Sequence, residues 1–110
     1  MSSFIQIIEM RCKNIDELMA LDRQWERATE GKRTTRRSVV TRDRNDPDRY
    51  ILVVFFDSYE SAMKNSNLPE TSELASKLGA LVDGPIVFND LDVVEDWTEE
   101  RNSRGGGARL

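Results

Sequence analysis

At 110 residues, with a formal net charge of −4, 38% hydrophobic residues and 33% charged residues, the chain has the size and composition of one globular domain. The acidic balance argues against general binding to nucleic acid or to an anionic membrane. No apolar stretch approaches the ~18 residues of a membrane span, and the first residues lack the basic and apolar regions of a signal peptide. We therefore expect a soluble, cytoplasmic protein.

The chain contains no histidine and one cysteine, Cys12. The lack of histidine excludes His-based acid–base catalysis, His-ligated metal and haem held by a proximal histidine. One cysteine forms no intramolecular disulfide and no cysteine-rich zinc site, so we interpret Cys12 as a small, half-buried side chain near a strand end. We expect no metal and no cofactor. A catalyst built from this sequence would use carboxylate, Tyr, Arg, Lys, Asn or Trp side chains.

The N-terminal part predicts a strand, a helix and a second strand. Residues 4–10 (FIQIIEM) are aliphatic and β-branched, as is typical of a strand. Asn14 and Glu17 have the spacing of a capping box, and Gly31 supplies a stop for the helix that follows them. Residues 33–43, rich in Thr, Val and Arg, predict a strand with a charged, exposed side. The apolar residues of the helix recur on one face: Leu18, Leu21, Trp25 and Ala28.

The middle of the chain predicts a turn, a buried strand and a short helix. Residues 45–48 (NDPD) favour a turn. Residues 50–56 (YILVVFF) have no polar break after the tyrosine, as in a central strand. Asp57 and Glu60 repeat the capping-box spacing and open a short helix that runs to about Met63.

The C-terminal part predicts a long helix and a last strand. Residues 65–67 (NSN) interrupt the short helix, and Pro69 is suited to the first turn of the next one. Residues 86–96 predict the final strand. We place the folded domain at residues 1–97 and expect the glycine-rich residues 98–110 to form a disordered tail.

The order β-α-β-β-α-β predicts an α+β, ferredoxin-like fold with a four-stranded antiparallel sheet. Right-handed crossovers would place both helices on one face, with the first and third strands central. Two helices cover only one face, so an apolar second face needs a partner, and we expect an obligate homodimer formed through this face. The third strand is apolar on both sides: Ile51, Val53 and Phe55 on one, Leu52, Val54 and Phe56 on the other.

Charge differs between the two predicted edge strands. One interpretation is that these charges keep the edges soluble and block unwanted pairing. The other is that the basic edge of one subunit meets the acidic edge of its twin. The nearby acidic residues argue against nucleic-acid binding by the arginines. The basic set is Arg33, Arg36, Arg37, Arg42 and Arg44, and the acidic set is Asp90, Asp92, Glu95, Asp96, Glu99 and Glu100.

Residues 55–85 (FFDSYESAMKNSNLPETSELASKLGALVDGP) and 88–93 (FNDLDV) resemble the antibiotic biosynthesis monooxygenase (ABM) superfamily, in particular its small actinobacterial members. The pattern is strand, helix, Asn-Ser-Asn, Leu-Pro-Glu-Thr, helix and Asp-Gly-Pro. The resemblance implies a dimer whose two sheets pack into an α/β barrel, with a cavity between the helices and the sheet of each subunit. It also implies cofactor-independent quinol oxidation as one activity, whereas the haem-degrading branch uses a histidine that this chain lacks.

Several residues are candidates for that cavity. Trp25 lies on the buried face of the first helix. It either forms a wall of the cavity or packs in the hydrophobic core without contacting a ligand. Asn65 and Asn67 stand at the helix break, where an amide binds a substrate oxygen or caps the turn. Asp90 is either a base or a solvated edge carboxylate. The remaining candidates are Arg37, which reaches the cavity or the partner subunit, and Tyr50, which begins the central strand.

Two functions remain open. The first is a cofactor-free monooxygenase-like enzyme acting on a small aromatic or quinol-type substrate, with Trp25, Asn65 and Asn67 orienting it and a carboxylate or tyrosine as base. The second is a non-catalytic dimeric ligand-binding or structural protein of the same fold. No pair of residues has the spacing of a known catalytic motif, so the sequence alone does not decide between them.

Overall fold

The computed structural model of the chain describes residues 3–99. The predicted tail over residues 98–110 lies outside the described residues from residue 100 onward, so it stays a prediction. No helix within residues 3–99 is long and apolar enough to cross a membrane. The elements follow in the order β1 (Phe4–Arg11), α1 (Ile15–Ala28), β2 (Arg37–Asp43), β3 (Asp46–Phe56), α2 (Tyr59–Ser66), α3 (Pro69–Leu81) and β4 (Val87–Asp92).

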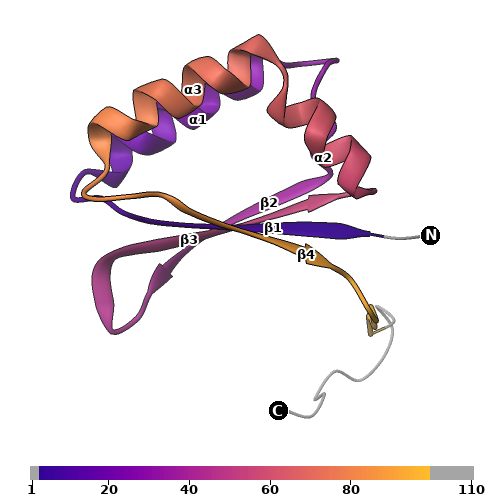
Figure 1. The fold of residues 1–110 in the computed structure, drawn as a ribbon. Helices are drawn as coiled ribbons and strands as arrows, with labels where there is room; N and C mark the ends of the chain where they lie inside the picture. Colours follow the sequence, from indigo (N-terminus) through magenta and orange to yellow (C-terminus); the bar gives the residue numbers. More distant parts are fainter. Residues whose placement is uncertain (1–2, 100–110) are drawn as a thin grey trace.

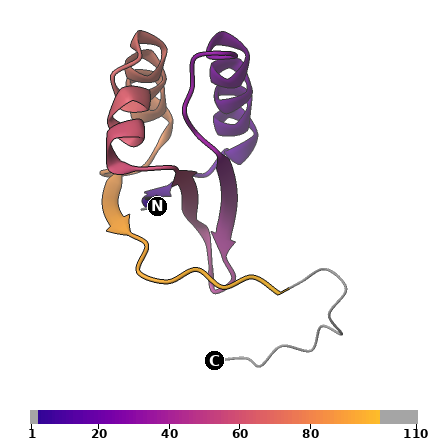
Figure 2. The same cartoon turned by 90° about the vertical axis from the view of Figure 1, so that its right-hand side faces the viewer.

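The strands form one antiparallel sheet in the order β2-β3-β1-β4 (Figure 1). β1 and β3 are central while β2 and β4 lie at the edges, which confirms the predicted ferredoxin-like α+β fold. The helices lie together on one face of the sheet, and the chain after β4 passes to the opposite side (Figure 2). None of the described helices covers that opposite face, which we call the uncovered sheet face.

The register of the strands defines the side chains of the uncovered sheet face. They alternate along each strand with the side chains that point toward the helices. This face is largely apolar, as predicted from the alternation in β3. Its rows, read from β4 to β2, are Leu91, Ile5, Phe55 and Arg37; Asn89, Ile7, Val53 and Val39; and Val87, Glu9, Ile51 and Thr41.

The two long helices begin where the sequence predicts. The Asn14 side chain accepts a hydrogen bond from the Glu17 N–H and caps α1. α1 ends at the buried Thr29, and Gly31 has a φ of +82° in the turn that follows. Pro69 takes the first position of α3, where its missing N–H removes no helical bond.

The turn between β2 and β3 differs from the prediction. The sequence predicts a turn at residues 45–48, but the structure turns at residues 44–45 and β3 already begins at Asp46. Strand pairing overrides the local turn preference of these residues, because Asp46 already pairs with Asp43 of β2. On its other side β3 pairs with β1 as far as Arg49, and the Cys12 N–H donates to the Asp48 carbonyl at 2.9 Å. Tertiary pairing therefore decides this boundary.

Ser58 caps α2, whereas the sequence predicts Asp57. The Ser58 hydroxyl accepts a hydrogen bond from the Ser61 N–H at 3.0 Å. Asp57 is one residue too early and pairs instead with Arg36 at 2.7 Å. At its other end α2 continues to Ser66, beyond the predicted end at about Met63.

Both edge strands are shorter than predicted. β2 begins only at Arg37, because the preceding link is held by α2: the Thr34 N–H donates to the Asn65 side-chain oxygen at 3.1 Å. β4 ends at Asp92, since its partner in β1 is Phe4, the first residue of that strand. The following residues, up to residue 99, form no strand.

Buried apolar side chains form two small clusters at opposite ends of the sheet. Leu18 anchors α1 in one cluster and Ala62 anchors α2 in the other. Ile8 and Leu52 are partly buried, lie between the clusters and pack against both. The core is therefore split, with the centre of the sheet less completely covered than its ends. The clusters are Phe4, Val54, Phe56 and Ala62, and Met10, Cys12, Leu18 and Tyr50.

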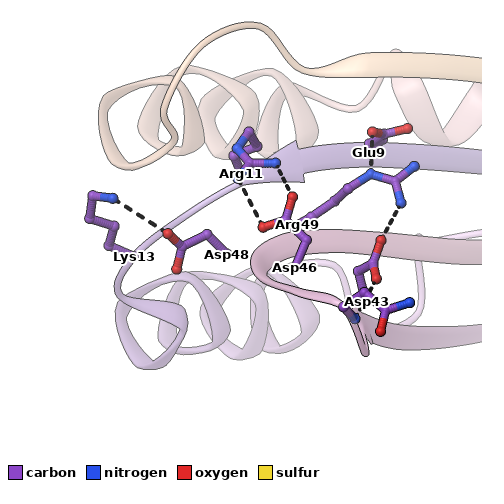
Figure 3. A network of polar contacts seen from close by, with 8 residues as sticks. Glu9, Arg11, Lys13, Asp43, Asp46, Asp48 and Arg49 are labelled. Atoms are coloured by element: carbon purple, nitrogen blue, oxygen red, sulfur yellow. Dashed lines mark hydrogen bonds and ion pairs between the residues drawn. The ribbon is translucent and has the colours of Figure 1, made fainter.

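Ion pairs join the ends of β1, β2 and β3 near the hairpin (Figure 3). Arg49 lies between Glu9 and Asp43, at 2.7 and 2.6 Å, and Arg11 contacts Asp46 at 2.6 Å. The hydrogen bond from Arg49 lowers the pKa of Glu9, because it favours the ionised carboxylate. Glu9 and the apolar rows share one face, so this network gives the uncovered sheet face a polar border.

Candidate functional site

A cleft of about 790 Å³ lies between the helices and the covered face of the sheet. Small-molecule sites typically have volumes of ~300–1,000 Å³. Ile8 and Leu52, which lie between the two core clusters, form part of its floor. The cleft therefore occupies the place where the core is split. A smaller groove of about 300 Å³ runs between α1 and α3 and is lined by residues including Leu21, Ala28, Glu73 and Lys77.

One polar row crosses the floor of the cleft. The register aligns Asp90 of β4 with Gln6 of β1, and Ser38 of β2 lies two strands further on, beyond Val54. The Gln6 side-chain amide donates to the Asp90 carboxylate at 3.1 Å. The next row, with Phe88, Ile8 and Leu52, is apolar. A bound molecule thus meets an amide and a carboxylate beside an apolar surface.

Trp25 links the two long helices in the roof of the cleft. Its indole N–H donates to the Thr71 hydroxyl of α3 at 3.0 Å. The Arg33 guanidinium lies 6.0 Å from the centroid of the indole ring, within the range of a cation–π interaction. These two contacts fix the orientation of the ring, which contributes an aromatic surface to the cleft.

Asn65 forms part of the end wall, where the α1–β2 link meets α2. The residue is 7% exposed, and its side-chain oxygen accepts the hydrogen bond from Thr34. Thr34 also donates its hydroxyl to the Ser61 carbonyl at 2.6 Å. The amide oxygen of Asn65 therefore holds the link in place while the residue lines the cleft.

Asp22 brings a carboxyl group to the roof, one helical turn before Glu26. Burial raises the pKa of Asp22, and the charge of Glu26 and its hydrogen bond to Asp22 raise that pKa further. Arg23 and Arg33 act in the opposite direction but do not cancel the rise. Asp22 is therefore a stronger base than an exposed aspartate, and it faces the same space as Trp25.

The cleft contains some of the residues predicted from the sequence. Trp25, Asn65 and Asp90 all line it. Arg37 also contributes to its lining, but its guanidinium lies 5.2 Å from the centroid of the Phe55 ring, a residue of the uncovered sheet face.

Two predicted candidates are not among the residues that line the cleft. Tyr50 is 6% exposed and packs in the core cluster around Leu18, because its position in β3 lies at the end of the sheet. Asn67 is exposed and ends α2 as its C-cap. For Asn67, the interpretation as a turn residue agrees with the structure.

Sequence reasoning missed Asp22, Gln6 and Thr71 as lining residues. Asp22 lies four residues after Leu18 and three before Trp25, so the helical period already places it near the buried stripe. Gln6 lies between Phe4 and Ile8 in the alternation of β1, so it shares their face of the sheet. This pattern predicts a polar group on the covered face. Thr71 carries no comparable signal.

The described part of the chain contains no cluster of three or more Cys, Asp or Glu residues placed to hold a metal ion. The carboxyl groups of the cleft are instead distributed between its roof, at Asp22 and Glu26, and its floor, at Asp90. The chemistry that this arrangement offers is hydrogen bonding and proton transfer beside an aromatic wall.

Solved structures share this fold at low sequence identity. A candidate antibiotic biosynthesis monooxygenase from Caulobacter crescentus superposes with a TM-score of 0.74 at 12% identity, over 86% of this chain and 92% of that one. Another from Nitrosomonas europaea gives 0.70 at 11% identity, over 84% and 90%. A third, from Chloroflexus aurantiacus, gives 0.66 at 20% identity, over 87% and 97%.

The sequence itself matches no family model and no curated protein. The likeness to solved structures therefore shows the fold: this chain has the ABM-type ferredoxin-like fold that the resemblance implied. At these identities, function has to be argued from the residues of the cleft.

The raised pKa of Asp22 predicts a pH-dependent effect of Asp22→Asn on stability. A carboxyl group whose folded pKa exceeds its ordinary value of 3.8 stabilises the fold fully below that value, and this contribution is lost as the pH rises through the folded pKa. Asp22→Asn should therefore raise Tm at pH 7 and change it little at about pH 3. Thermal melts followed by circular dichroism at both pH values measure this.

Asp83→Asn, at an exposed position outside the cleft, is the matched control. Its Tm should stay within about 2 °C of wild type at both pH values. A lower Tm for Asp22→Asn at pH 7 would show that the Asp22 carboxylate stabilises the fold, contrary to this account.

Proposed function

We propose that the chain is a cofactor-independent monooxygenase-like enzyme that acts on a small aromatic substrate of the quinol type. The observation that carries this proposal is the cleft, with its volume of about 790 Å³, its apolar floor, its single polar row and the indole of Trp25. A quinol has the matching form, a flat ring with hydroxyl groups at its edge. The names of the structures that share the fold support the same class of activity.

In this reaction the protein has to bind the substrate, orient it and remove a proton from it. An electron-rich quinol becomes a better electron donor to O₂ once a hydroxyl group is deprotonated. In the net reaction one oxygen atom enters the substrate, the other leaves as water, and the substrate supplies the electrons. In the cleft, the ring would pack between Trp25 and Leu52 while a hydroxyl group reaches the Gln6–Asp90 pair.

A second candidate function is ligand binding without catalysis. The observation that favours it is that several polar groups of the cleft are already paired with one another: Gln6 with Asp90, Trp25 with Thr71, and Asn65 with Thr34. Such a lining fixes the shape of a pocket without an obvious reactive group. Turnover measurements separate the two functions.

Oxygen uptake with a panel of quinols tests the enzymatic proposal. Ala75→Trp adds an indole to an exposed position of α3 that lines the cleft, so it should reduce kcat/KM at least about tenfold by occupying substrate space. Ala80→Trp makes the same change on the same helix outside the cleft and should stay within about twofold of wild type. An oxygen electrode records both.

Two outcomes of this experiment count against the proposal. Absence of uptake by wild type with every quinol would leave the binding function as the better account. Equal loss in Ala75→Trp and Ala80→Trp would show that damage to the helix, and not occupation of the cleft, lowers the rate.

We further propose that two copies associate through the uncovered sheet face, in the cytoplasm, where the lone buried Cys12 suits a reducing compartment. The support is the apolar rows of that face, with Leu91 46% exposed and Val87 45% exposed. The chain after β4 lies on the same side and carries Val94 and Trp97, 98% and 73% exposed, which a second copy would cover. Stable interfaces bury ~800 Å² per partner, a size that a four-stranded sheet face suits.

Sedimentation velocity tests this association. Wild type should sediment as a dimer at micromolar concentration, and Val53→Asp, in the middle row of the uncovered sheet face, should shift it to the monomer because an unpaired charge would be buried. Ser76→Asp, at an exposed position of α3, should leave the dimer unchanged. A monomeric wild type would contradict the proposed interface.

A further inference from the structure

Two carboxyl groups adjoin in the roof of the cleft. Asp22 and Glu26 are separated by one turn of α1, both line the cleft, and their carboxyl groups are within hydrogen-bonding reach of each other. Asp22 is half-buried while Glu26 is exposed. The pair thus joins the interior of the cleft to solvent, beside the ring of Trp25.

The surroundings of Asp22 leave its carboxyl group available. No ion pair within residues 3–99 joins it to an arginine or lysine. Arg33 is engaged elsewhere, since it donates to the Glu26 carbonyl and the Thr29 hydroxyl. The side chains that line the cleft from α3, such as Thr71 and Leu74, carry no charge.

The other charged side chains that line the cleft are Arg36, Arg37 and Asp90, and each has a partner away from Asp22. Arg37 lies 5.2 Å from the centroid of the Phe55 ring. Arg36 is held by Asp57 at 2.7 Å, and Asp90 accepts from Gln6 at 3.1 Å. Arg23 lies on α1 beside Asp22 and, like Arg33, favours the ionised carboxylate. The sheet floor beneath contributes uncharged side chains such as Met10 and Ile8.

The geometry points to Asp22 as the group that takes the proton from a hydroxyl group of the bound phenolic ring, with Glu26 as the neighbouring carboxylate that strengthens it as a base. This inference rests on the proposed function and adds to it the identity of the base and a requirement for a substrate with an acidic O–H group. Two adjoining carboxylates repel each other, and uptake of one proton relieves that repulsion.

The step is a single proton transfer. The O–H bond of the phenol breaks, its electron pair stays on the oxygen as phenolate, and the proton binds a carboxylate oxygen of Asp22. The exposed Glu26 carboxylate can then accept the proton and release it to water, which returns Asp22 to its ionised form. Asp22 is a catalytic residue in this account, and Glu26 is a positioning residue that acts through it.

The binding of 4-nitrophenol tests this inference without any turnover, because phenol and phenolate differ in absorption spectrum. The chain has two tryptophans, so Trp97→Phe leaves Trp25 as the one fluorophore of this type, and its quenching reports occupation of the cleft. At a pH equal to the pKa of the free ligand, about half of free 4-nitrophenol is phenolate. In the cleft, the ionised Asp22 should accept the hydrogen bond of the neutral phenol and repel the phenolate, so less than about a tenth of the bound ligand should be phenolate.

Two variants in the Trp97→Phe background identify the base. Asp22→Asn keeps the shape of the side chain but removes its charge, so quenching should persist while the phenolate fraction of the bound ligand rises to about half. Glu26→Gln removes the neighbouring charge from an exposed position, so its phenolate fraction should lie between the two. Circular dichroism checks that both variants fold, and Glu26→Gln keeps the test decisive should Asp22→Asn not fold.

Each other outcome overturns the inference in a distinguishable way. Bound ligand that is as ionised with Asp22 intact as it is in free solution would exclude Asp22 as the group that meets the hydroxyl, while oxygen uptake with quinols could still support the proposed function. An unchanged phenolate fraction in Asp22→Asn and Glu26→Gln would assign the proton to another group. A lack of Trp25 quenching would contradict both the inference and the quinol site.

Discussion

The helices can cover only one face of a sheet whose central strands are apolar on both faces, and the rest of the molecule depends on this constraint. β1 and β3 alternate large aliphatic and aromatic side chains toward the helices and away from them. Removing the second set from water would contribute on the order of ten kcal/mol before the costs of association. We propose a second copy of the chain as the partner that covers the apolar rows and the exposed Leu91 and Trp97.

The covered face is also incompletely filled, and the cleft follows from this. α1 and α3 pack mainly against each other, joined by the bond between Trp25 and Thr71. They reach the buried core at one end of the sheet, through Leu18 and Leu78, while α2 reaches it at the other end through Ala62. Ile8 and Leu52 consequently stay partly exposed at the centre, where a continuous core would have buried them. A carboxyl group with a raised pKa, Asp22, lies in the same region. Solvent-exposed apolar side chains beside a half-buried carboxyl group lower the free energy of unfolding. Such a loss of stability is common where a site binds a ligand.

Local patterns in the sequence predict most of the fold. Alternation in β1 and β3 identifies the central strands, and Asn14 and Pro69 mark the starts of α1 and α3, because these signals act through the residue's own backbone or its near neighbours. The boundaries that differ depend on distant partners. Asp57 has the spacing of a cap but pairs with Arg36, and β3 begins early because Asp46 pairs with Asp43 of β2.

The candidate site could be predicted less completely, for a related physical reason. Trp25 and Asn65 follow from the helical stripe and the helix break, and both line the cleft. Tyr50 is in the core because the register, which no local pattern reveals, places it at the end of the sheet. The proximity of Asp22 to Thr71 and Gln6 arises only when α1, α3 and β1 assemble. The role as a base that we propose for Asp22 could not be predicted from the sequence, since burial and not residue type raises its pKa.

We propose that the split core holds an aromatic ligand between Trp25 and the floor of the sheet. A crystal structure of the protein soaked with hydroquinone shows whether a ring occupies this place. We expect a ring in the cleft, packed between Trp25 and Leu52, with one hydroxyl group within hydrogen-bonding distance of Asp22. A cleft closed by direct packing of α1 and α3 onto Ile8 and Leu52, with no ligand between them, would contradict it.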